Sequence, residues 1–211
     1  MTKLKELNNK NFEEIIKTIH SICGNIQRSK NVKKTNNSNS LDTESNYRDN
    51  IALILNSYPS PFEGLVNAEA QNNHGKTDII INFLNNKKYV AECFVLKDND
   101  SIPSRTKKKF NQLIYNITDD DDKISLILFV LKKKFEPITI FEKIKEVIKK
   151  QSIQGKLIDL QEKYKNKVWI LTVKIKKYPE LKLYIHICIY YFFYDVNYSE
   201  CQKIKTKNKI I

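Results

Sequence analysis

The hydrophobic period of the sequence changes near Phe62. Before this point apolar residues recur at helical spacing, and from Phe62 to Leu96 they alternate with polar residues. A period of two is the pattern of a β-strand. Turns that contain Asn and Gly divide the stretch into three expected strands, residues 62–71, 76–84 and 88–96. The pattern therefore predicts a β-meander.

Helices and further strands surround this meander. The spacing predicts helices over residues 10–28, 47–58, 103–117 and 137–151, and strands over residues 124–131, 168–176 and 181–193. The run 124–131 is almost wholly apolar, which is typical of a central strand covered on both faces. We therefore expect the α/β class, with a central mixed β-sheet flanked by helices.

The composition indicates how the chain is organised. Residues 1–29 are expected to form an amphipathic helix that docks on the domain or on a partner. Residues 30–45 are rich in Asn, Ser, Thr and Lys without apolar periodicity, which is typical of a flexible polar linker. Residues 46–196 are expected to form the main domain, and residues 197–211 a basic C-terminal tail.

The charge of the chain favours a phosphate-bearing partner. The 211 residues include 37 Lys and Arg against 24 Asp and Glu, a formal net charge of +13. Only three of the basic residues are Arg, and lysine suits contact with phosphate better than the reading of base edges. A solvated lysine surface is the alternative interpretation.

Two classes of protein are excluded on sequence grounds. The N-terminus has no apolar segment of a secretory signal, and the most apolar run, residues 181–194, is too short to span a bilayer. The four cysteines are scattered and do not cluster with the three histidines, so a zinc site or a disulfide framework is not expected. We expect a cytoplasmic protein that does not bind a membrane.

Three acidic residues, Glu69, Asp78 and Glu92, stand in strand-like surroundings. Carboxylates are depleted from strand interiors, so each needs a physical reason. A three-residue loop at 84–86 would place Asp78 opposite Glu92, with their Cβ atoms roughly 5 Å apart. A two-residue turn at 85–86 would send Glu92 to the opposite face. The register therefore decides whether the two carboxylates form a pair.

An opposed pair of carboxylates repels unless a proton, a cation or water intervenes. Mg²⁺ or Mn²⁺ is one solution, because such ions take oxygen ligands and commonly bind one or two carboxylates together with a substrate phosphate. The alternative is a solvated polar face on which Asp78 pairs with Lys76 or Lys88.

Three segments, GKTDIII, VAECFVLK and FNQLIYNITDDDDKISLILFVLKK, together resemble a bacterial family of the PD-(D/E)xK nuclease superfamily. Its pattern runs approximately GKTDILI, then IAECKFWKG, then QLLGYLTWRDTKAALIIF. The likeness extends upstream to YRDNIALILN and NAEAQNNHGKTD, and downstream to VWILTVKI, so it covers about residues 47–193.

The resemblance implies a restriction endonuclease-like core and metal-dependent cleavage of DNA with low intrinsic sequence specificity. Asp78, Glu92 and the backbone carbonyl of Cys93 would then hold Mg²⁺ or Mn²⁺, with Glu69 as a further acidic ligand. Gln112 matches a helix glutamine that lies near the active centre of such nucleases.

Phe94 stands where the family has a lysine that positions the attacking water. Two lysines are candidates to replace it. Lys76 lies two residues before Asp78 on the same face, and Lys97 matches a later lysine of the family pattern. Because side chains alternate along a strand, Lys97 and Glu92 lie on opposite faces unless the strand ends or bulges before Lys97. The rival interpretation is a catalytically degenerate nuclease fold that acts as a DNA-binding or protein-interaction module.

Contact with DNA is expected mainly through the phosphate backbone. The candidate residues open the helix after the third strand or follow the apolar strand 124–131, namely Arg105, Lys107, Lys108, Lys109, Lys132 and Lys133. A homodimer contact or a partner protein would use the N-terminal helix.

Overall fold

A computed structural model of the chain describes residues 2–32, 43–57, 64–72, 75–83, 88–97, 100–131, 136–165 and 167–191. The helices are α1 (Thr2–Val32), α2 (Glu44–Ser57), α3 (Ile102–Asn116) and α4 (Pro137–Gln151), followed by a short 3-10 turn (Ile153–Gly155). The strands are β1 (Gly64–Asn72), β2 (Gly75–Phe83), β3 (Lys88–Leu96), β4 (Lys123–Val130), β5 (Asp159–Tyr164), β6 (Val168–Ile175) and β7 (Tyr178–Tyr191).

The strands form one mixed sheet in the order β1-β2-β3-β4-β7-β6-β5. β3, β4 and β7 are parallel neighbours, and the other pairs are antiparallel. A parallel pair needs a crossover connection, which α3 supplies between β3 and β4. The expected α/β class, with a mixed sheet flanked by helices, is confirmed.

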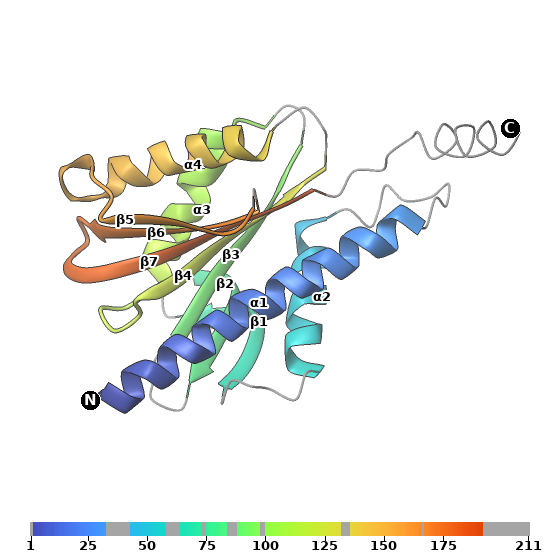
Figure 1. Ribbon diagram of the computed structural model, residues 1–211, viewed down its shortest axis with the longest axis horizontal. Helices are drawn as coiled ribbons and strands as arrows, with labels where there is room; N and C mark the ends of the chain where they lie inside the picture. Colours follow the sequence, from blue (N-terminus) through green and yellow to red (C-terminus); the bar gives the residue numbers. More distant parts are fainter. Residues whose placement is uncertain are drawn as a thin grey trace, which may run out of the picture.

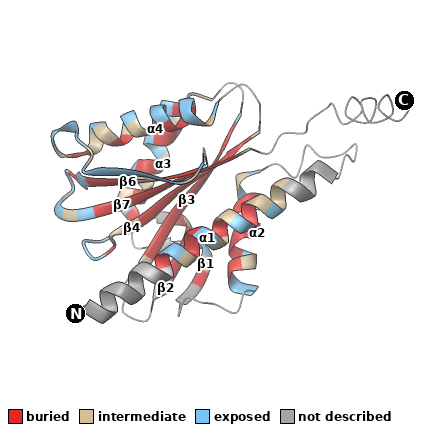
Figure 2. Cartoon of the chain, in the orientation of Figure 1, coloured by how far each residue is buried: buried red, intermediate tan, exposed pale blue. Residues whose placement is uncertain are grey.

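Helices cover both faces of the sheet (Figure 1): α1 and α2 lie on one face, and α3 and α4 on the other. The side chains of β3 alternate between the two layers. Ala91 and Cys93 belong to the core under α1 and α2, whereas Val90 and Phe94 belong to the core under α3 and α4. In β3 and β4 every residue after the first is buried (Figure 2), which explains why β4 is apolar on both faces.

The α1 helix packs on the sheet, because Ile15 and Ile19 are fully buried in the same core as residues of β3, β4 and β7. It is longer than the predicted helix and ends at Val32, so residues 30–32 of the expected linker are helical. The rest of that linker to residue 42, and the tail 197–211, lie outside the described residues. No helix in the described part of the chain is long and apolar enough to cross a membrane.

One strand was not predicted. β5 carries the polar sequence DLQEKY, and its first five side chains are exposed at the edge of the sheet. An edge strand of this kind has no apolar alternation from which it could be recognised.

His186 on β7 is a buried histidine whose ring packs against Phe12 of α1, with 4.2 Å between the ring centroids. Burial, and then the charges of Lys163 and Lys123, lower the pKa of His186 to about 3. In the unfolded chain the pKa is about 6.5, so the unfolded state binds more protons between these values. Neutral His186 therefore contributes its full stability at pH values above the pKa that it has in the unfolded chain. This contribution is lost as the pH falls towards the pKa that His186 has in the folded protein.

We therefore expect His186→Phe to be less sensitive to acid than the wild type. At pH 5 the wild type should lose about 2 kcal/mol more of its unfolding free energy than the variant does, relative to neutral pH. Urea unfolding of both proteins across this range measures the difference. Equal pH slopes would contradict a buried neutral imidazole.

Candidate active site

The register of β2 and β3 places Asp78 beside Glu92. Ile79 pairs with Ala91 and Ile80 with Val90, and one further residue along this antiparallel ladder brings position 78 opposite position 92. The chain neighbours of these two residues, Ala91 and Cys93 beside Glu92 and Ile79 beside Asp78, belong to the core under α1 and α2. Because side chains alternate along a strand, Asp78 and Glu92 both face the α3 layer. This is the register predicted for a three-residue loop, and it brings the two carboxylates together.

The register of β1 and β2 extends this row by one strand. Ala68 pairs with Ile79 and Ala70 with Thr77, so the backbone of Glu69 lies between these pairs, level with Asp78. The three acidic positions therefore form one row across β1, β2 and β3. The side chain of Glu69 lies outside the described part of the structure.

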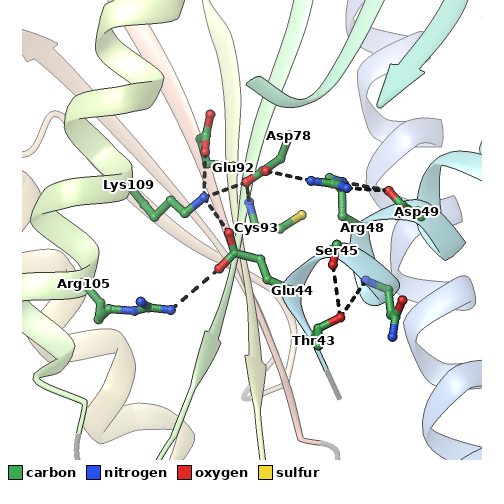
Figure 3. Close-up of polar contacts among 11 residues, drawn as sticks. Thr43, Glu44, Ser45, Arg48, Asp49, Asp78, Glu92, Cys93, Arg105 and Lys109 are labelled. Atoms are coloured by element: carbon green, nitrogen blue, oxygen red, sulfur yellow. Dashed lines mark hydrogen bonds and ion pairs between the residues drawn. The ribbon is translucent and has the colours of Figure 1, made fainter. Parts of the chain in front are cut away.

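The ammonium group of Lys109 lies among the carboxylates (Figure 3). Its Nζ donates hydrogen bonds to Asp78 Oδ2 at 2.8 Å and to Glu92 Oε2 at 3.1 Å. It also forms an ion pair with Glu44 Oε1 at 2.8 Å. Lys109 comes from α3, which crosses the face of the sheet that carries both strand carboxylates. One lysine thus joins side chains from α2, β2 and β3.

Glu44 reaches the site because of how α2 begins. The Thr43 hydroxyl accepts a hydrogen bond from the Asn46 N–H at 3.3 Å, an N-cap contact that starts the helix at Glu44. The Glu44 carboxylate then lies 2.8 Å from Lys109 and 3.7 Å from the guanidinium of Arg105. A carboxylate at a helix N-terminus is favoured by the helix dipole.

Arg48 lies one turn further along α2 and is buried. Its guanidinium donates to Asp49 Oδ1, with both Nε and the terminal nitrogen at 2.8 Å, and lies 3.6 Å from Asp78 Oδ1. Asp78 is therefore flanked by two cations, Arg48 from α2 and Lys109 from α3 (Figure 3).

Asp78 is held as a carboxylate. Burial raises the pKa of Asp78, but the charge of Lys109 and the hydrogen bonds that the carboxylate accepts outweigh the effect of burial and leave the pKa lowered. One of these hydrogen bonds comes from the Cys93 N–H, which donates to Asp78 Oδ2 at 2.8 Å. Burial lowers the pKa of Lys109, and the charges of Glu92 and Asp78 outweigh it and leave the pKa raised. The aspartate and the lysine thus form a stable ion pair.

Glu92 lies in a different environment. It is 1% exposed, and its Oε1 has no hydrogen-bond partner among the described residues. Burial, and then the neighbouring charge of Asp78, raise its pKa to about 8. A buried carboxylate oxygen without a partner is costly, and a proton or a metal cation would relieve that cost.

The oxygen donors fit a hard divalent ion. In the described part of the chain, no cluster of three or more His, Cys, Asp or Glu side chains is arranged to hold a metal. Mg²⁺ needs less than this, because it keeps several waters and commonly binds one or two carboxylates plus a substrate phosphate. Asp78 and Glu92, with the orphan oxygen of Glu92, meet that requirement.

The other candidate residues are placed differently. Lys97 is exposed, and its N–H donates to Asp100 Oδ2 at 2.8 Å, as expected for a lysine beyond the end of β3. Gln112 lies one turn beyond Lys109 on α3, and its Oε1 is buried without a partner among the described residues. The side chain of Lys76 and all of Lys132 and Lys133 lie outside the described residues.

The expected phosphate contacts on α3 are divided between two environments. Lys107 and Lys108 are exposed. Arg105 donates to the Val95 carbonyl at 3.1 Å and pairs with Glu44. Lys109, expected among the phosphate contacts, instead points into the carboxylate cluster, and its side chain is only 12% exposed.

Sequence reasoning missed Glu44, Arg48 and the position of Lys109. A signal existed for the lysine, because Lys109 lies three residues before Gln112 and four after Arg105, so the three share one helix face. For Glu44, the signal was Thr43, a favourable N-cap residue followed by an acidic first turn.

Comparison with known proteins identifies no family. The chain matches no protein-family model, and no curated protein and no solved structure is significantly similar to it.

Proposed function

We propose that this protein is a metal-dependent endonuclease with a restriction endonuclease-like fold, which hydrolyses DNA phosphodiester bonds with little intrinsic sequence specificity. The observation that carries the proposal is the contact of Lys109 Nζ with both Asp78 and Glu92. It supplies from α3 the ammonium group that the sequence lacks at Phe94. The mixed sheet flanked by helices agrees with the fold that the resemblance implies.

Asp78 and Glu92 would hold Mg²⁺ or Mn²⁺, with Glu69 and the Cys93 carbonyl as further oxygen donors. When bound, the ion supplies Lewis-acid chemistry, which acidifies a water and offsets charge on the phosphate. Lys109 stays protonated, because its pKa is raised, and it donates hydrogen bonds where negative charge develops in the reaction. Arg48 holds Asp78 from the other side.

The exposed lysines of α3 support DNA as the substrate. Lys107 and Lys108 lie on the same helix as Lys109, immediately before it, and both are exposed. Ammonium groups on a flexible stem suit contact with the phosphate backbone and carry no base preference. On a helix they do not share the face of Lys109, so they would contact the DNA backbone on the exposed side of α3, next to the carboxylate site.

A second candidate function is a metal-independent DNA-binding module on a degenerate nuclease fold. The observation that favours it is that Lys109 already contacts three carboxylates, Glu44, Asp78 and Glu92. Such a lysine neutralises part of the acidic cluster without a metal ion. This candidate predicts salt-sensitive DNA binding that needs no divalent ion.

Plasmid nicking distinguishes the two functions. With Mg²⁺ or Mn²⁺, Asp78→Asn should cut supercoiled DNA at least about a hundredfold more slowly than the wild type, because it loses a charged ligand and the partner of Lys109. Asp120→Asn is the matched control, since Asp120 is exposed in the turn before β4. Wild-type protein that binds DNA without nicking it under either metal would favour the binding module.

A further inference from the structure

A cavity of about 220 Å³ lies on the opposite face of the sheet from the candidate active site. Its walls come from α1 and from β4, β5, β6 and β7, and they include Phe12, Lys123, Lys163, Tyr184 and His186. His186 belongs to the face that α1 covers, because its ring packs against Phe12. The side chains of Asp78 and Glu92 face α3, so the two sites are separate.

The cavity contains a buried polar group that lacks a partner. His186 is 2% exposed, and neither of its ring nitrogens has a hydrogen-bond partner among the described residues. A neutral imidazole carries one donor and one acceptor, and leaving either unpaired in the interior costs free energy. His186 lines the cavity, so a molecule inside it is within reach of this ring.

The charge and shape of the walls indicate what kind of molecule fits. Lys123 Nζ lies 5.3 Å from the centroid of the Phe12 ring, and Lys163 Nζ pairs with Glu13 at 2.9 Å. Among the described residues that line the cavity, two ammonium groups and one carboxylate are present. Both lysines line the same cavity as His186, and their charges contribute to lowering its pKa. Phe12 and His186, whose rings are tilted by 60° to each other, contribute aromatic atoms to the wall of the cavity.

The volume limits the size of the occupant. At about 30 Å³ per water molecule, the cavity holds roughly seven waters, and it is smaller than the pockets that bind drug-sized ligands. A single aromatic ring with one acidic group is of this size.

We propose that this cavity binds a small planar ring that bears one carboxylate or phosphate group. The ring lies against Phe12 and His186, and the anionic group contacts the ammonium groups of Lys123 and Lys163. A ring that contains a nitrogen atom also pairs with the imidazole of His186. The proposal is independent of nuclease activity, because none of these residues belongs to the carboxylate cluster.

A nitrogen-15 NMR titration tests the proposal with four probes: nicotinate, benzoate, phenyl phosphate and the neutral nicotinamide. The chain has three histidines, so the imidazole resonances of His186 are assigned by comparison with His186→Phe. We expect nicotinate, benzoate or phenyl phosphate to shift these resonances saturably. Nicotinamide should bind at least about tenfold more weakly than nicotinate, because it lacks the charge that the lysines recognise.

Variants separate this site from weak surface binding. The double variant Lys123→Ala and Lys163→Ala should lower the affinity for the acidic probe that binds best by at least about tenfold, whereas Lys143→Ala, an exposed lysine on α4, should leave it unchanged. The preference between benzoate and phenyl phosphate distinguishes a carboxylate from a phosphate ligand. The proposal is overturned if none of the acidic probes shifts His186, if nicotinamide binds as well as nicotinate, or if the double variant binds like the wild type.

Discussion

Lys109→Met is expected to lower the rate of metal-dependent DNA cleavage by about 10²–10³-fold, the usual effect of removing one charged donor from a transition state. Methionine keeps much of the length of the lysine side chain but carries no charge. The two carboxylates on β2 and β3 then lose the ammonium that lies 2.8 Å from Asp78 and 3.1 Å from Glu92. Initial rates of plasmid nicking, measured at equal concentrations of folded protein, give the effect.

The same variant should lose stability in the absence of metal. Breaking a buried ion pair by removing one partner costs about 3 kcal/mol or more, and the Lys109 side chain is only 12% exposed. Mn²⁺ should raise the melting temperature of Lys109→Met more than that of the wild type, because the cation can replace the lost ammonium. Lys108→Met, at an exposed position of the same helix, is the matched control. A Lys109→Met protein that cuts DNA at the wild-type rate would remove the lysine from the mechanism.

Phe94→Lys is expected to destabilise the protein rather than improve its activity. Phe94 is fully buried in the core between the sheet and the helices α3 and α4. Loss of a buried phenyl group alone costs about 3–5 kcal/mol, and burial of an unpaired ammonium adds to that cost. Lysine in the place that the family pattern prescribes would therefore lower the unfolding free energy by more than 3 kcal/mol on the same scale.

Phe94→Leu is the control for this prediction, because it changes packing without adding charge and should cost less than a full truncation, which costs about 3–5 kcal/mol. Urea unfolding of both variants gives the two free energies. If Phe94→Lys were as stable as Phe94→Leu and cut DNA faster than the wild type, position 94 would open onto the active site. The role assigned to Lys109 would then be wrong.

Local patterns were sufficient to predict most of the sheet. The alternation in β1, β2 and β3 and the apolar run of β4 predicted four neighbouring strands to within a few residues. The pairing of Asp78 with Glu92 followed from one assumption about loop length, because each strand has a period of two and the register fixes which faces coincide. The strands and their register can be predicted because both depend on residues that are close together in the sequence.

The contacts that complete the site could not be predicted in the same way. Lys109 reaches the carboxylates only because α3 crosses the sheet at a particular angle, and no periodicity within the helix encodes that angle. Glu44 joins them because Thr43 starts α2 earlier than the apolar pattern does. Phe94 illustrates the same limit. Phe94 is buried in the core under α3 and α4, and a lysine from α3, Lys109, contacts the carboxylates. Both facts depend on how the layers pack against one another.

Whether Asp78 is catalytic is decided by the ratio of the initial nicking rates of the wild type and Asp78→Asn in Mn²⁺, with DNA binding measured on the same preparations. We expect a ratio of at least about one hundred, with DNA affinities within about threefold of each other, because Asp78 would hold the metal ion at the scissile phosphate rather than contact the rest of the DNA backbone. A ratio near one, or a wild type that binds DNA and never nicks it, would contradict the claim that Asp78, Glu92 and Lys109 form a catalytic centre.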